Sequence, residues 1–213
     1  MPKFDLCVIT RRVDQPKRSH LDVARAALAG GATIIQLRDK TLASRALWQV
    51  GQSLRNLTRE HGATFIVNDR LDIALAVEAD GVHLGEEDVP ISVARRLLGA
   101  AAVIGASVAD PERARAAQAE GASYLGVGPV FETSSKPDAG AAVGTGPLAQ
   151  IKRAVTIPVL AIGGVNCDNV SAVLRTGADG VAVISAVAEA DDMVAAARAL
   201  SCLIREARRA KGR

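Results

Sequence analysis

The fold class that the sequence predicts is α/β, a single (β/α)₈ TIM barrel with its active site at the C-terminal ends of the strands. Eight short apolar runs, rich in β-branched residues, alternate with Ala-, Leu- and Arg-rich segments that have helical apolar spacing. Strands that alternate with helices imply parallel pairing through crossover connections. A weak repeat supports the same units, because AGGAT, EHGAT, AEGAS and RTGAD each place a glycine between a helix and a strand.

The expected strands and helices can each be identified from a segment of the sequence. LCVIT, TIIQL, TFIV, GVHL, VIGA, YLGV, PVLAI and GVAVI give the expected strands, at residues 6–10, 33–37, 64–67, 81–84, 103–106, 124–127, 158–162 and 180–184. Helical spacing follows in the segments between them, at residues 21–28, 44–60, 91–98, 111–120 and 168–175. The glycines of the repeat suit the left-handed backbone that commonly ends a helix. An open doubly wound sheet is the competing topology, because a strand count alone does not prove closure.

The composition indicates one globular domain over residues 1–213, with 49% hydrophobic and 2% aromatic residues. The formal net charge is +3, and the one basic run is the tail at about 205–213, which we interpret as a solvated helix end. Without an aromatic-rich basic patch we expect no nucleic-acid partner. No apolar stretch reaches the roughly 18 residues of a spanning helix and the first residues do not resemble a signal peptide, so we expect no membrane partner and a cytoplasmic location.

The three cysteines, Cys7, Cys167 and Cys202, are far apart and have no CxxC or CxxH spacing. This argues against a disulfide framework or a zinc site and fits a reducing compartment. The sequence leaves the oligomeric state open.

Polar residues gather where the expected strands end. Gln36, Arg38 and Lys40 alternate at the end of the second strand, so they share one face. A guanidinium fork and an ammonium at the mouth of a barrel can bind a multiply charged phosphate. Solvated strand-end charges are the alternative interpretation. Further polar residues lie at the ends of the next strands, namely Asn68, Asp69, His83, Glu86, Glu87, Asp88 and Ser107.

Asp69 and Asp88 follow neighbouring strands and form a plausible oxygen-ligand pair for Mg²⁺, which takes one or two carboxylates and completes its shell with water and substrate phosphate. Both residues also precede helical sequence, so helix capping is the competing interpretation.

The segment after the sixth strand, GPVFETSSKPDAGAAVGTG, is long and rich in Gly, Ser and Thr, and it carries Lys136. Loops of this length are uncommon unless they are functional or disordered, so we expect a phosphate-binding lid. The turns AIGGV and VISAV end the last two strands, where this fold often binds phosphate. For the GG turn, close packing of the barrel is the competing interpretation.

No nucleophilic triad is predicted. Ser107 and Ser185 have no histidine placed by the sequence to activate them, and His83 lies on an expected buried strand, where a hydrogen-bonded structural role is the favoured interpretation. His20 and His61 flank helices in polar sequence, and we assign them no role.

QLRDK, VNDR, ADGVHLGEED, IGAS, GVGPVFETSSK, AIGGV and GADGVAVIS together resemble the thiamine-phosphate synthase (thiamine-phosphate pyrophosphorylase) family, in order and over nearly the whole chain. The resemblance implies a transferase of thiamine biosynthesis. It would join 4-amino-2-methyl-5-(diphosphooxymethyl)pyrimidine to a thiazole ethyl phosphate by a Mg²⁺-assisted dissociative substitution, releasing diphosphate and giving thiamine phosphate. The implied partners are these two small-molecule substrates.

The resemblance also implies the roles of individual residues. Arg38, Lys40, Ser107 and Lys136 would be catalytic, and Asp69 and Asp88 would bind the metal. The pyrimidine diphosphate would be held by Gln36, Arg38, Lys40, Asn68, Ser107 and Lys136, and the thiazole phosphate by Thr133, Ser135, Gly164, Ile184 and Ser185.

The sequence departs from the commonest family pattern at Glu86, where Gln is frequent, at Arg70, where some members have Asp, and at Ser135, where Thr is frequent. Glu86 adds a negative charge beside the expected diphosphate site. A thiazole tautomerase-like isomerase is an alternative function, although Pro129 stands where some tautomerases have His. A non-catalytic barrel that binds phosphate ligands is the third.

Overall fold

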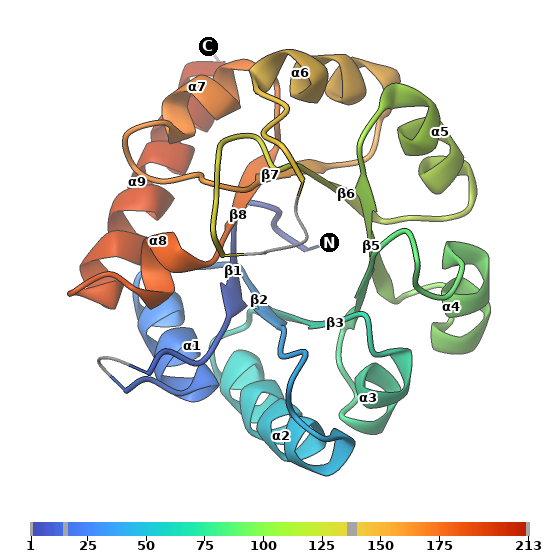
Figure 1. Cartoon of the computed structure of the whole chain (residues 1–213), viewed down its shortest axis with the longest axis vertical. Helices are drawn as coiled ribbons and strands as arrows, with labels where there is room; N and C mark the ends of the chain where they lie inside the picture. The colour runs from blue at the N-terminus through green and yellow to red at the C-terminus, as the bar shows by residue number, and fades with distance from the viewer. Residues whose placement is uncertain (1, 15–16, 136–139, 212–213) are drawn as a thin grey trace.

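The computed structural model describes residues 2–14, 17–135 and 140–211. Eight parallel strands form one closed barrel in which each strand pairs with its neighbours in the chain and β1 pairs with β8 (Figure 1). The strands are β1 (Leu6–Thr10), β2 (Ile34–Leu37), β3 (Thr64–Asn68), β4 (Gly81–Leu84), β5 (Val103–Val108), β6 (Tyr124–Val127), β7 (Val159–Ile162) and β8 (Gly180–Val183). The prediction of a single (β/α)₈ barrel is therefore confirmed, and the open doubly wound sheet is wrong.

Helices surround the barrel and alternate with its strands (Figure 1). They are α1 (His20–Ala29), α2 (Ser44–Glu60), α3 (Leu71–Ala76), α4 (Ile91–Leu98), α5 (Pro111–Ala119), α6 (Thr145–Ala154), α7 (Val170–Arg175), α8 (Ser185–Ala188) and α9 (Met193–Lys211). Of the described helices, none has the length and the apolar content needed to cross a membrane.

Local signals explain where several helices begin and end. Ser19 and Asp22 form a capping box at the start of α1, and Asp110 caps α5 with Pro111 in the first turn. Glycines of the repeat adopt positive φ between helix and strand, for example Gly62 at 61° and Gly177 at 101°. The expected left-handed turns are therefore present.

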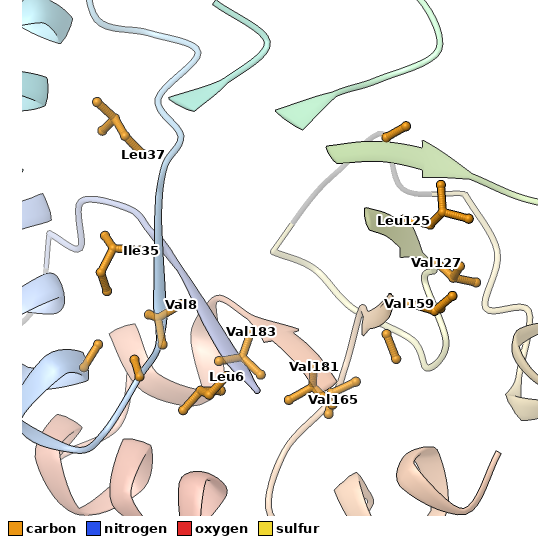
Figure 2. Packing of buried hydrophobic residues seen from close by; sticks show 14 of the residues in the cluster. Leu6, Val8, Ile35, Leu37, Leu125, Val127, Val159, Val165, Val181 and Val183 are labelled. Carbon is orange, nitrogen blue, oxygen red and sulfur yellow. The ribbon is translucent and has the colours of Figure 1, made fainter. Parts of the chain in front are cut away.

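Apolar side chains pack in two places because successive residues of a strand face opposite sides of the barrel wall. Outward-facing residues such as Leu6, Val8 and Ile35 point toward the surrounding helices (Figure 2). A smaller group fills the barrel itself, namely Cys7, Ile9, Ile34, Ile66, Val103, Tyr124, Leu160 and Ala182. These inner side chains fill the barrel below the C-terminal ends of the strands.

The basic tail is more than a solvated helix end. α9 continues to Lys211, and the Arg208 guanidinium donates to the backbone carbonyls of Phe4 (3.0 Å) and Asp179 (2.5 Å) and pairs with the Asp5 carboxylate. These partners precede β1 and β8, so Arg208 joins the two strands that close the barrel, at its N-terminal end.

Candidate active site

A cavity of about 480 Å³ opens at the C-terminal ends of the strands. It brings together nine of the residues singled out in the sequence, from six different strands or the turns that follow them. They are Gln36, Arg38, Asn68, Ser107, Thr133, Ser135, Gly164, Ile184 and Ser185. Hydrophobic residues of the barrel interior, including Cys7 and Leu160, line its deeper part. The cavity therefore has polar walls above an apolar floor, as ligand pockets commonly do.

Lys40 lies in a second hollow of about 330 Å³, which shares Arg38, Ser135 and Ile184 with the main cavity. Its wall also contains Arg11 and Arg12 from the end of β1. A strongly basic rim therefore adjoins the cavity. Such a rim suits a ligand with several negative charges.

The loop that carries Arg38 and Lys40 is built around Asp39, whose carboxylate is 7% exposed. One carboxylate oxygen accepts from the Thr41 amide (2.8 Å), the Thr41 hydroxyl (2.7 Å) and the Leu42 amide (3.0 Å). The other accepts from Arg12 Nε (3.0 Å) and lies 3.1 Å from His20 Nε2. Burial raises the pKa of Asp39, but these hydrogen bonds outweigh it and hold the pKa well below its usual range.

His20, to which the sequence assigned no role, takes part in this hydrogen-bonded group. It is 2% exposed, and its Nδ1 lies 2.8 Å from the Thr10 hydroxyl, so it links the ends of β1 and β2. Burial lowers its pKa more than the neighbouring Asp39 raises it, so His20 is neutral near pH 7. Sequence reasoning missed it because a histidine at a helix start usually faces solvent. The inward turn of α1 is visible only in the fold.

Asp69 and Asp88 lie close enough to interact. Burial and the facing Asp88 carboxyl group raise the pKa of Asp69 to about 6, against the opposing charges of Lys40 and Arg38. Neither residue caps a helix by its side chain: α3 and α4 have no side-chain cap, and Asp88 accepts from the Gly85 amide at 2.6 Å. The capping interpretation is therefore wrong. Two facing carboxylates near two cations fit a hard divalent cation that also meets phosphate oxygens.

Ser107 has a histidine partner after all. His83 Nε2 lies 3.0 Å from Ser107 Oγ, and His83 Nδ1 lies 2.9 Å from the Tyr124 hydroxyl. The expectation that no histidine accompanies Ser107 is wrong, because neighbouring strands bring residues 24 positions apart into contact. The histidine is nevertheless oriented by a phenol rather than by a carboxylate, so the set is not a Ser-His-Asp triad.

The far wall of the cavity comes from the loop after β6 and from the turns after β7 and β8. Ser135 Oγ donates to Ser185 Oγ at 3.0 Å, which joins this loop to the start of α8. The loop is also held to the β7 turn, because the Phe131 amide donates to the Gly163 carbonyl at 3.0 Å. Gly164 has φ +63°, and a Cβ there would lie 2.5 Å from the Glu132 carbonyl oxygen. A glycine is therefore needed for this close approach.

Two further expectations concern this end of the barrel. Lys136 lies outside the described residues. Glu86 is largely exposed and pairs with Arg113 at 3.3 Å, so part of its charge is balanced by a neighbouring helix.

Tyr124, Asn166 and Glu132 also line the cavity although sequence reasoning did not select them. Tyr124 alternates with Gly126 on β6 and with Gly128 just after it, and this alternation is the signal that could have placed Tyr124 inside.

A closed (β/α)₈ barrel with a hydroxyl-rich cavity at the C-terminal ends of its strands, beside a hollow lined by Arg11, Arg12, Arg38 and Lys40, defines an enzyme of the class that binds phosphorylated small molecules. Residues 6–187 match the family model TMP-TENI, described as thiamine monophosphate synthase. A thiamine-phosphate synthase of Moorella thermoacetica is 53% identical, over 98% of this chain and 99% of that protein. One of Methanospirillum hungatei is 51% identical, over 93% and 97%.

Among solved structures, thiamine phosphate pyrophosphorylase from Pyrococcus furiosus superposes with a TM-score of 0.88 at 46% identity, covering 97% of this chain and 98% of that one. The chain belongs to the thiamine-phosphate synthase family. The predicted enzyme class, a transferase of thiamine biosynthesis, is confirmed by these relatives.

Proposed function

We propose that this enzyme joins 4-amino-2-methyl-5-(diphosphooxymethyl)pyrimidine to a thiazole ethyl phosphate, releasing diphosphate and forming thiamine phosphate. The observation that carries the proposal is the convergence of Gln36, Arg38, Ser107 and Ser185 in one cavity beside Lys40 and the Asp69–Asp88 pair. The family membership supports the same reaction.

The reaction breaks the bond between the pyrimidine methylene carbon and a diphosphate oxygen, and both electrons leave with the diphosphate. The aminopyrimidine ring stabilises the resulting cation, so no protein nucleophile is needed. The main task of the protein is to neutralise the departing charge, which we assign to Arg38 and Lys40 and, from the resemblance alone, to Lys136. Gln36, Asn68 and Ser107 would hold the pyrimidine and its diphosphate.

Asp69 and Asp88 are the residues that would hold Mg²⁺. When bound, Mg²⁺ would supply charge stabilisation to the leaving diphosphate. The donor set fits, since both side chains offer carboxylate oxygens. The pKa of Asp69 is raised first by burial and then by the facing Asp88 carboxyl group, and a bound cation would offset both effects.

The second task is to place the thiazole nitrogen in line with the methylene carbon and to exclude water, which would otherwise capture the cation. Thr133, Ser135, Gly164, Ile184 and Ser185 would bind the thiazole phosphate. They come from the loop after β6 and the turns after β7 and β8, whereas Gln36, Asn68 and Ser107 come from β2, β3 and β5, and this supports the division of the cavity between the two substrates. We also propose a cytoplasmic location and a single domain over residues 1–213.

The test is to follow diphosphate release and thiamine phosphate formation by the purified chain, omitting each substrate and Mg²⁺ in turn. We expect products in equal amounts only when all three are present. Arg38→Ala should lower kcat/KM by at least about 100-fold. Arg115→Ala, which removes an exposed guanidinium on α5, is the matched control and should leave it unchanged.

Isomerisation of the thiazole phosphate alone, without diphosphate release, would replace the synthase with the tautomerase. Binding of both substrates without turnover would favour a non-catalytic barrel.

A further inference from the structure

In one layer of the barrel interior, the rings of His83 and Tyr124 approach each other across Gly105. His83 on β4, Gly105 on β5 and Tyr124 on β6 are direct partners in the strand register. A Cβ at position 105 would lie 2.2 Å from Tyr124 Cζ and 2.4 Å from His83 Nδ1. Gly105 therefore leaves the space in which the His83 and Tyr124 rings approach, with centroids 5.5 Å apart.

His83 and Tyr124 each contact one further polar side chain. On one side His83 Nε2 reaches Ser107 Oγ at 3.0 Å. On the other side lies the buried Gln36 side chain, 3% exposed; burial raises the pKa of Tyr124, and hydrogen bonding to Gln36 opposes that rise, as a donating amide does. Gln36 and Ser107 both line the cavity, and both belong to the proposed pyrimidine site. The Tyr124–His83 pair thus joins two substrate-binding side chains from beneath.

The donors and acceptors in this series of hydrogen bonds, from Gln36 through Tyr124 and His83 to Ser107, follow one direction, because each hydroxyl carries a single proton. When the Gln36 amide nitrogen donates to the Tyr124 oxygen, the Tyr124 hydroxyl proton is available to His83 Nδ1. A neutral His83 then carries its proton on Nε2 and donates it to Ser107 Oγ. The Ser107 hydroxyl proton is left for the cavity, and Gln36 turns its carbonyl oxygen to the cavity.

Resting on the proposed function, we propose that Tyr124 and His83 are positioning residues that fix this polarity, presenting Gln36 as a hydrogen-bond acceptor and Ser107 as a donor. A 4-aminopyrimidine offers the matching groups, an exocyclic amino donor and unprotonated ring nitrogens. The 4-oxo analogue offers a carbonyl where the amino group stands and a protonated ring nitrogen. Gln36 would then face a second acceptor, and buried groups left unpaired are the strongest source of discrimination between similar ligands.

The first measurement is the tautomer of His83, read from long-range ¹H–¹⁵N correlations of the full chain labelled at its three histidines. His83→Gln assigns the signal by its loss. We expect the Nε2-protonated neutral ring in the wild type and a mixture of tautomers in Tyr124→Phe, which removes one hydroxyl and keeps the ring. An Nδ1-protonated or a doubly protonated His83 in the wild type would overturn the proposal.

The second measurement is the dissociation constant of the 4-amino pyrimidine methyl diphosphate and of its 4-oxo analogue, by calorimetry with Mg²⁺ and without thiazole. We expect at least about 100-fold preference for the amino compound in the wild type and a preference at least about tenfold smaller in Tyr124→Phe, because Gln36 is free to rotate. Phe4→Leu, which alters the ring that packs on Tyr124 at 5.2 Å but keeps the hydroxyl, is the control and should keep the preference.

The outcomes separate the two proposals. A wild type that forms no thiamine phosphate contradicts the proposed function, while the His83 tautomer still decides whether the polarity is as described. An active enzyme whose preference for the amino compound is the same in wild type and Tyr124→Phe contradicts this inference alone.

Discussion

Asp39 is the residue whose replacement should reveal how the cationic loop is held. Asp39→Asn keeps the size of the side chain and one oxygen, which can still accept from the Thr41 and Leu42 amides. The other oxygen becomes an NH₂ group that faces the Arg12 Nε–H, so two donors meet there, and His20 Nε2 keeps a partner only if its proton moves to Nδ1, beside the Thr10 hydroxyl. The change therefore removes charge-assisted bonds without creating a cavity.

The magnitude follows from the number of bonds affected. Two hydrogen bonds to a charged group at about 1.5–3 kcal/mol each set an upper range, and the 52% exposure of Arg12 reduces its share, so we expect a loss of about 3 kcal/mol. For a chain of this size that corresponds to a fall in Tm of roughly 6–12 °C. Because Arg38 and Lys40 flank Asp39, the KM for the pyrimidine diphosphate should also rise.

The pH dependence has a definite sign. The pKa of Asp39 is lower in the folded than in the unfolded chain, so its stabilisation is present above the ordinary value of 3.8 and is lost as the pH falls through the folded value. The stability difference between wild type and Asp39→Asn should therefore be constant from pH 6 to 8 and shrink below about pH 4.

The assay is urea unfolding across this pH range, with Asp72→Asn as the control. Asp72 is 63% exposed and pairs with Arg70 on the surface, so its loss should cost less than about 1 kcal/mol. An Asp39→Asn variant as stable as Asp72→Asn would refute the role given to this hydrogen-bonded group.

Three further predictions concern other parts of the barrel. Mg²⁺ should raise the Tm of the wild type, measured by scanning calorimetry, but not the Tm of Asp69→Asn. Asn is chosen because it tolerates the positive φ of 61° at this position. An equal rise in both proteins would mean that Asp69 does not bind the metal. Gly164→Ala should cost at least about 2 kcal/mol and raise the KM for the thiazole phosphate, whereas Gly146→Ala, with open space around its Cβ, should do neither. Arg208→Ala should cost about 1–2 kcal/mol in urea unfolding and leave kcat unchanged, since its partners lie at the N-terminal end of the barrel; a fall in kcat would contradict this separation.

The barrel was predictable because periodicity reports which face of each element is buried. The strands expected at 81–84 and 124–127 are found with the same bounds, and α2 and α4 agree with their expected segments as well. Strand ends were less accurate: β5 continues to Val108, because its last residues still pair with β6 although Ser107 is polar. Pairing across the sheet, which a single strand cannot report, decided that boundary.

The candidate site was predictable where its residues follow a pattern along one strand and the loop directly after it, as Gln36, Arg38 and Lys40 do. It was not predictable where a partner comes from another strand. His20 reaches Asp39 from the start of the preceding helix, α1, and Tyr124 reaches His83 across β5. Neither spacing has a sequence signature, since contact depends on the barrel register and on the space left by Gly105.

Both hydrogen-bonded groups support residues of the proposed substrate site, and His83 and Tyr124 also line the cavity themselves. Asp39 and His20 support the loop of Arg38 and Lys40, and Tyr124 and His83 support Gln36 and Ser107. A substitution reaction without a protein nucleophile depends on charges and dipoles that are already oriented when the leaving group departs. Rigid support beneath the contacting side chains supplies that orientation. We therefore expect changes in these supporting residues to impair turnover even though none of them belongs to the proposed substrate contacts.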